Sequence, residues 1–240
     1  MVRQWIGAVL IGLTLCGSAR ADDLDDFNAA VEAAAAHNRV ALGYLRTDSV
    51  DLAVIELERM KEAWAALTGR FGSHRPAVFR DNPLYAETLV DVPVRIVAAL
   101  LVLDMGRTDL ARDSLQAVRR SLSAMRRASG VEVLADCVLD ANAAMAAFLA
   151  LDNSPPDWGN PQTAAEVAGK AAALASVVNR CDRMAPAGVR SEPGFRRLID
   201  GTLHALTFVP RMIEMHDNDL LHRLAGELRA FDHLLVFRYG

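Results

Sequence analysis

Residues 94–125 read VRIVAALLVLDMGRTDLARDSLQAVRRSLSAM, and this stretch decides the fold. An apolar run is interrupted at residues 106–109 by Gly-Arg-Thr-Asp, and a second apolar series follows. Glycine suits the left-handed residue that ends a helix, and Thr or Asp suits the cap of the next helix. The second series recurs every three or four residues, as on one helix face, at Ala111, Leu115, Val118, Leu122 and Met125. The stretch therefore predicts an antiparallel helical hairpin.

The same alternation of amphipathic segments and short breaks continues along residues 22–240. No alternating apolar runs bounded by turns predict strands. We therefore expect one all-α domain, an array or bundle of about eight antiparallel amphipathic helices. The expected helices cover about 22–46, 52–70, 84–105, 110–128, 131–151, 162–184, 195–215 and 221–239.

The first 21 residues have the pattern of a secretory signal peptide. Arg3 precedes a short apolar core, and Ala19-Arg20-Ala21 offers small residues for cleavage. Cys16 raises the alternative of a lipoprotein, but Leu15 stands where a small residue is expected. We expect a periplasmic or secreted protein that is cleaved near Ala21.

Two cysteines, Cys137 and Cys181, remain after cleavage. An even pair in an oxidising compartment predicts a disulfide, which would join two helices across a Pro-rich break. Two free buried thiols are the alternative. A redox-active pair is disfavoured because the Cys-x-x-Cys spacing is absent.

The charge of the mature chain bears on its partners. Removal of Arg3 and Arg20 leaves 24 basic and 30 acidic residues, a net charge of −6. This balance argues against nucleic acid as a partner. No segment after the leader reaches about 18 apolar residues free of charge, so we expect no transmembrane span.

An offset of 58 residues relates two segments of the chain. Asp51-Leu52-Ala53 recurs as Asp109-Leu110-Ala111. The apolar series Ala53, Leu57, Met60, Trp64 and Leu67 coincides, after adding 58, with the series that ends at Met125. The match predicts an internal repeat, although any two amphipathic helices entered by Asp would align in a similar way.

The turns at 48–53 and 106–111 resemble those of tetratricopeptide (TPR) helical hairpins. Tyr44 stands at the family's aromatic position, with Leu57 after the turn, and Val102 and Leu115 occupy the corresponding places in the second segment. The offset of 58 differs from the family's period of about 34, and the closing Pro is absent. The resemblance implies helical hairpins that bind peptides or partner proteins.

Residues 152–161, DNSPPDWGNP, form the clearest interruption. This segment is either a linker between two subdomains or a loop that Trp158 packs over the bundle. We expect the packed loop, because flexible linkers seldom contain Trp.

Residues 214–222 are rich in potential metal ligands. His216, Asp219 and His222 are the candidates for zinc or copper, whereas the alternative is a solvated turn in which Asp219 caps the last helix. His204 lies among apolar residues and is expected in the core. Covalent haem is excluded by the absence of Cys-x-x-Cys-His, and a non-covalent haem remains an alternative. We expect no cofactor.

Arg119, Arg120, Arg126 and Arg127 lie on one helix, where a spacing of seven returns to the same face. This basic strip is a candidate for binding lipid head groups or an acidic partner. The alternative is a solvated face paired with acidic neighbours.

Enzyme signatures are missing from the chain. It contains no Gly-rich phosphate loop, His-Glu-x-x-His, Gly-x-Ser-x-Gly or calcium loop. We therefore expect a non-catalytic exported protein that binds another protein of the cell envelope. The alternative is a periplasmic helical bundle that carries a small ligand, metal or non-covalent haem.

Overall fold

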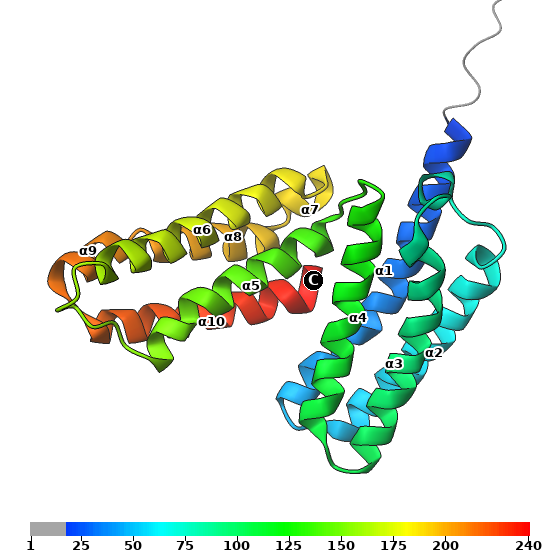
Figure 1. Ribbon diagram of the computed structural model, residues 1–240, viewed down its shortest axis with the longest axis horizontal. Coiled ribbons are helices and arrows are strands. Elements are labelled where there is room, and N and C mark those ends of the chain that lie inside the picture. Colours follow the sequence, from blue (N-terminus) through cyan, green and yellow to red (C-terminus); the bar gives the residue numbers. More distant parts are fainter. Residues whose placement is uncertain (1–17) are drawn as a thin grey trace, which may run out of the picture.

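The computed structural model describes residues 18–240, which fold into α-helices and one short 3-10 helix, without a strand in that range (Figure 1). The predicted all-α fold is confirmed. The signal peptide predicted for residues 1–21 lies outside the described residues except for its last four, which belong to the first helix.

The first four helices form two antiparallel hairpins with a common core. Helix α1 (Ser18–Arg46) pairs with α2 (Val50–Phe71), and α3 (Pro83–Asp104) pairs with α4 (Thr108–Ala128). The 3-10 helix η1 (Ala77–Phe79) lies in the connection between the hairpins. All ten residues of the two apolar series predicted to repeat are buried in this core. Four aromatic side chains pack together at one end of it: Phe27, Phe71, Phe79 and Tyr85.

The turns of both hairpins have the same backbone geometry at equivalent positions of the predicted repeat. Asp48 and Gly106 are 58 residues apart, and both adopt a left-handed conformation, with φ of 59° and 72°. This conformation lets the chain reverse directly after the first helix of each pair. The same hydrogen bond closes each turn, from Ser49 N to Tyr44 O (2.9 Å) and from Arg107 N to Val102 O (2.8 Å).

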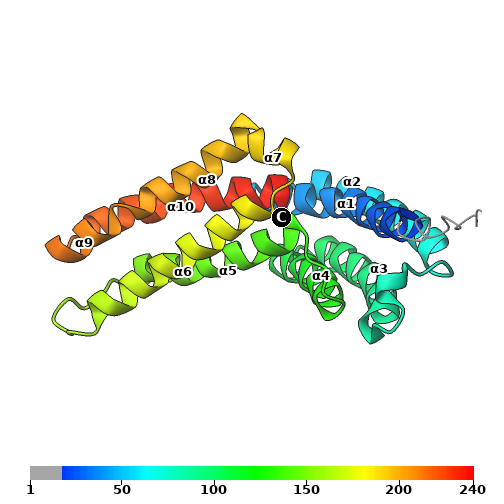
Figure 2. The same cartoon turned by 90° about the horizontal axis from the view of Figure 1, so that it is seen from above.

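The remaining helices form a second bundle with its own core. It contains α5 (Leu134–Asn153), α6 (Thr163–Met184), α7 (Ala187–Ser191), α8 (Pro193–Leu206), α9 (Val209–Met215) and α10 (Asn218–Tyr239). Helix α10 packs against α5 and α8, and its buried side chains, including Leu224, Leu228 and Leu235, belong to this core. Figures 1 and 2 show the two helix groups meeting where α4, α5 and the end of α10 come together.

The boundary between the two cores does not lie at residues 152–161, the place of the alternative subdivision. The cores separate between α4 and α5, whereas residues 154–162 connect two helices of the same bundle. Trp158 is partly buried against the second core, and its indole Nε1 donates to Asn218 Oδ1 (2.8 Å). The segment is thus the packed loop that the Trp predicted.

One expected helix is divided. The segment 195–215 breaks at Thr207 and Phe208, and Pro210 lies in the first turn of α9. Proline has no backbone N–H and clashes inside a helix, so it is accommodated at a helix start. Pro93, in contrast, is accommodated within the continuous helix α3.

Candidate functional site

The outer face of α3 is apolar and open to solvent. Val90, Leu101 and Met105, the C-cap residue of α3, are 67%, 61% and 66% exposed, and Val94 and Val97 lie between them on the same face. The spacing of these five residues is 4, 3, 4 and 4, so they form one stripe about 22 Å long at the rise of an α-helix. We call these five residues the α3 stripe.

The opposite face of α3 already fills the first core. Its buried side chains include Leu89, Val92 and Ile96. A helix that is apolar on both faces is normally buried on both. The α3 stripe is therefore an apolar surface without a covering element in the described residues, and contiguous surfaces of this kind mark interaction sites.

Acidic side chains stand at both ends of the α3 stripe. Glu87 and Asp104 are exposed, and neither forms an ion pair with any residue within 18–240. Between them, Asp91 is bound by Arg95 of the same helix and by the hydroxyl of Ser121 (3.1 Å). The unpaired negative charges of the α3 stripe therefore lie at its two ends.

The predicted basic strip on α4 is divided between the interior and the surface. Arg119 and Arg126 are 6% and 5% exposed, whereas Arg120 and Arg127 are exposed. The expectation of a continuous outward strip does not hold for Arg119 and Arg126, because their side of α4 faces the junction of the two helix groups. Arg120 and Arg127 keep an outward position.

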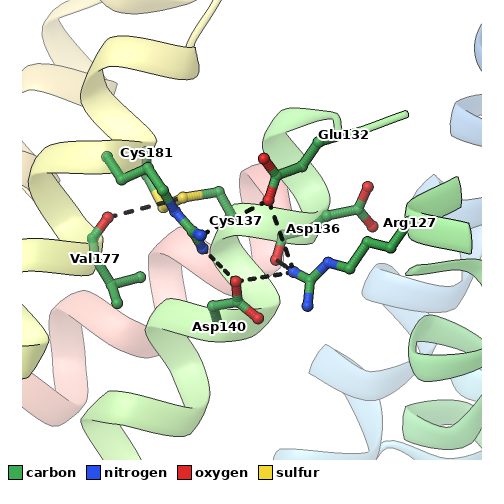
Figure 3. The surroundings of a disulfide bond; sticks show 8 residues. Arg127, Glu132, Asp136, Cys137, Asp140, Val177 and Cys181 are labelled. Atoms are coloured by element: carbon green, nitrogen blue, oxygen red, sulfur yellow. Dashed lines mark hydrogen bonds and ion pairs between the residues drawn. A yellow bond between two sulfur atoms is a disulfide. The ribbon is translucent and has the colours of Figure 1, made fainter. Parts of the chain in front are cut away.

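Arg127 belongs to a cluster of alternating charges beside the disulfide (Figure 3). Its Nη2 donates to Asp140 Oδ2 (2.8 Å), and Arg180 of α6 binds the same carboxylate. Glu132 lies 4.0 Å from Arg127 and 3.8 Å from Arg180. Both guanidinium groups lower the pKa of Asp140 against the opposing effect of burial, which is the largest single influence. The cluster connects α4, α5 and α6, as the alternative of paired charges on a solvated face predicted.

Cys137 and Cys181 form the predicted disulfide between α5 and α6. Both residues are fully buried in the second core. The bond therefore joins two neighbouring helices of one bundle across the Pro-rich loop, and it does not connect the two helix groups.

The three candidate metal ligands point to different partners. His216 stacks on the ring of Trp158 with centroids 5.3 Å apart, and His222 Nδ1 lies 2.8 Å from Asp152 Oδ1. Asp219 is exposed. No group of three His, Cys, Asp or Glu side chains suited to a metal ion occurs in the part of the chain that the structure describes.

Two further expectations in this region need correction. Asp217, and not Asp219, caps α10 by accepting from Leu220 N (2.7 Å), because the helix begins three residues earlier than expected. His204 is exposed and packs edge-on against Phe208, so it is not a core residue. Its side of α8 faces away from the bundle.

Helix α5 is the one helix of residues 18–240 with the length and composition of a membrane span. In the structure its apolar face, including Cys137, Met145 and Phe148, lies in the second core.

Comparison of the chain with protein-family models, curated proteins and solved structures finds no match.

The sequence contained a signal for the α3 stripe that periodicity analysis missed. Residues 84–105 hold two apolar series, one that includes Leu89, Val92 and Ile96, and the other beginning at Val90. A search for a single amphipathic face recognises the helix and overlooks its second face.

Proposed function

We propose that the protein is an exported, non-catalytic interaction protein whose α3 stripe binds an amphipathic helix of a partner protein in the cell envelope. The observation that carries this proposal is the exposure of five apolar side chains along one face of α3. Their spacing matches the pattern by which one helix packs lengthwise on another. The resemblance of the two hairpin turns to TPR units points to the same class of function.

Charge favours a different protein over a second copy of this chain. An antiparallel pair of α3 helices would match Val90 with Leu101 and Val94 with Val97. The same register would place Glu87 of each copy opposite Asp104 of the other copy. Like charges at both ends oppose this pairing, so the better partner has an apolar helix face with Lys or Arg at its ends.

Export is part of the proposal and has independent support. The leader pattern of residues 1–21 predicts it, and the Cys137–Cys181 disulfide is compatible with an oxidising compartment. N-terminal sequencing of protein recovered from the envelope should find a chain beginning near Asp22.

The binding test uses two designed helical peptides with the same leucine face and either Lys or Glu at the ends. Fluorescence anisotropy at low salt should show tighter binding of the Lys peptide. Val97→Asp should weaken that binding by at least about tenfold, because a carboxylate would be desolvated at the centre of the contact. Ala66→Asp, at an exposed position of α2, is the matched control and should leave binding unchanged.

Two results would contradict the proposal. Equal binding of both peptides would contradict the charge argument for a basic-ended partner, and unchanged binding by Val97→Asp would show that the α3 stripe is not the contact. A dimer in sedimentation velocity that Val97→Asp dissociates would assign the stripe to a second copy of the chain.

A further inference from the structure

A cavity of about 380 Å³ lies at the junction of the two helix groups. Helices α1 and α4 contribute one side, and the start of α5, α7 and the end of α10 contribute the other. Most of its lining is apolar and includes Val31, Leu122, Leu134 and Val189. Its volume is in the range of small-ligand sites, and ligand sites favour such boundaries between structural units.

Arg119 lines this cavity and is the residue that distinguishes it. The side chain is 6% exposed, and only its Nη1 has an acceptor, Gln116 Oε1 at 2.9 Å. Its Nε and Nη2 have no hydrogen-bond acceptor within the described part of the chain. A buried guanidinium normally has every N–H satisfied, since an unpaired buried donor is costly.

The charge of Arg119 is also poorly compensated. Burial, followed by the nearby Arg39 and Arg120, lowers the pKa of Arg119 to about 10, and Asp232 partly offsets this effect. The group therefore remains cationic at neutral pH without a carboxylate in contact.

The neighbouring arginines of the junction have hydrogen-bond acceptors. Arg126 is bound by both carboxylate oxygens of Asp136, and Arg39 binds Glu32 and donates to the carbonyl of Gly240 (3.0 Å). Arg119 thus differs from two buried arginines of similar position. A second polar group without a partner, Asn28 Oδ1, also belongs to the cavity lining.

We propose that the junction cavity binds a monocarboxylate with an apolar body, whose carboxylate accepts hydrogen bonds from Arg119 Nε and Nη2. The fork of a guanidinium matches the two oxygens of a carboxylate. The apolar body lies against the aliphatic side chains of α1, α4 and α5. Because Glu32 and Asp136 also line the cavity, a single negative charge is accommodated better than a multiply charged phosphate.

This site is separate from the α3 stripe, so the two proposals stand independently. The stripe lies on the outer face of the second hairpin, and the cavity lies between the two helix groups. Loss of peptide binding at α3 would leave the cavity proposal unaffected.

Isothermal titration with decanoate, 1-decanol and acetate tests the proposal. Decanoate should bind saturably and at least tenfold more tightly than 1-decanol, which lacks the charge, or acetate, which lacks the apolar body. Arg119→Met keeps a long side chain and removes the charge, and it should weaken decanoate binding about 10- to 100-fold. Arg120→Met, the exposed neighbour on the same helix, should leave it unchanged.

A second variant leaves Arg119 in place. Val189→Trp fills the cavity from α7 and should abolish decanoate binding while circular dichroism stays that of the parent. Two outcomes would overturn the proposal: no saturable binding of decanoate to the parent protein, or equal binding by Arg119→Met.

Discussion

Arg126 and Asp136 form a buried bidentate ion pair between the two helix groups. Arg126 Nε and Nη2 donate to the two carboxylate oxygens at 2.8 and 2.6 Å, and the side chains are 6% and 1% exposed. Asp136 Oδ2 also accepts from Val133 N (3.1 Å) at the start of α5. One carboxylate therefore holds the end of α4 and organises the first turn of α5.

Arg126→Met should destabilise the protein by about 3–5 kcal/mol, because it leaves Asp136 as an unpaired buried charge. Urea unfolding followed by circular dichroism measures this loss. Arg127→Met, at the exposed neighbouring position, is the control and should cost less than about 1 kcal/mol. A loss below about 1 kcal/mol for Arg126→Met would show that the pair does not stabilise the junction.

The disulfide should stabilise the second bundle by about 3–4 kcal/mol. The bonded cysteines are 44 residues apart, and closing a loop of this size restricts the unfolded chain. Comparison of the free energy of unfolding with and without reductant provides the measurement. The double variant Cys137→Ala/Cys181→Ala must be insensitive to reductant, and equal stability of the oxidised and reduced parent would contradict the prediction.

Asp232 should make stability decrease as the pH rises. Its side chain is 7% exposed, and burial raises its pKa to about 6, although the hydrogen bond from Asn142 (2.7 Å) and the charge of Arg119 act in the opposite direction. An acid with a raised pKa in the folded state holds its proton there after the unfolded chain has lost it. The contribution of Asp232 to stability therefore falls between about pH 4 and pH 6, by up to about 3 kcal/mol.

Asp232→Asn removes the loss of stability that ionisation of the buried carboxyl causes, and it retains an acceptor for Asn142. The variant should exceed the parent in stability by about 1–3 kcal/mol at pH 7.5 and differ little from it at pH 4.5. Urea unfolding at both pH values measures the difference. An equal gain in the free energy of unfolding at both pH values would show that titration of Asp232 does not cause the gain.

Gly201 on α8 marks a close approach to α10. A Cβ added there would lie 2.6 Å from the Phe231 ring, whereas one added at Gly226 of α10 would meet no atom within 4 Å. Gly201→Ala should therefore destabilise the protein by about 1–3 kcal/mol despite the better helix propensity of Ala. Gly226→Ala should stabilise it by up to about 1 kcal/mol. Thermal unfolding of the pair gives the comparison, and shifts of the same sign would contradict the predicted contact.

Periodicity predicted the helical hairpins well because local spacing and cap residues define them. The series from Ala53 and from Ala111 are buried as expected, and Asp48 and Gly106 occupy equivalent left-handed positions. The stacking of His216 on Trp158 depends on how distant segments meet, so the pattern of ligands in residues 214–222 did not reveal it.

The burial of Arg119 and Arg126 on α4 likewise could not be predicted from local spacing. A heptad spacing places Arg119 and Arg126 on one helix face, and nothing in that spacing shows whether the face meets solvent or another helix. Both side chains are buried because they lie at the junction, next to the start of α5 and the end of α10. Spacing therefore identified Arg119 as part of a basic strip but not the cavity beside it.

The sequence by itself determined the all-helical fold and the positions of the hairpin turns, because both depend on spacing within neighbouring segments. The disulfide was predicted instead from the two cysteines that follow the predicted leader. Only the tertiary structure decided that α3 leaves an apolar face uncovered and that Arg119 is buried beside a cavity. Both features depend on which helix faces pack together, and the sequence of a single helix does not show which other helix covers it.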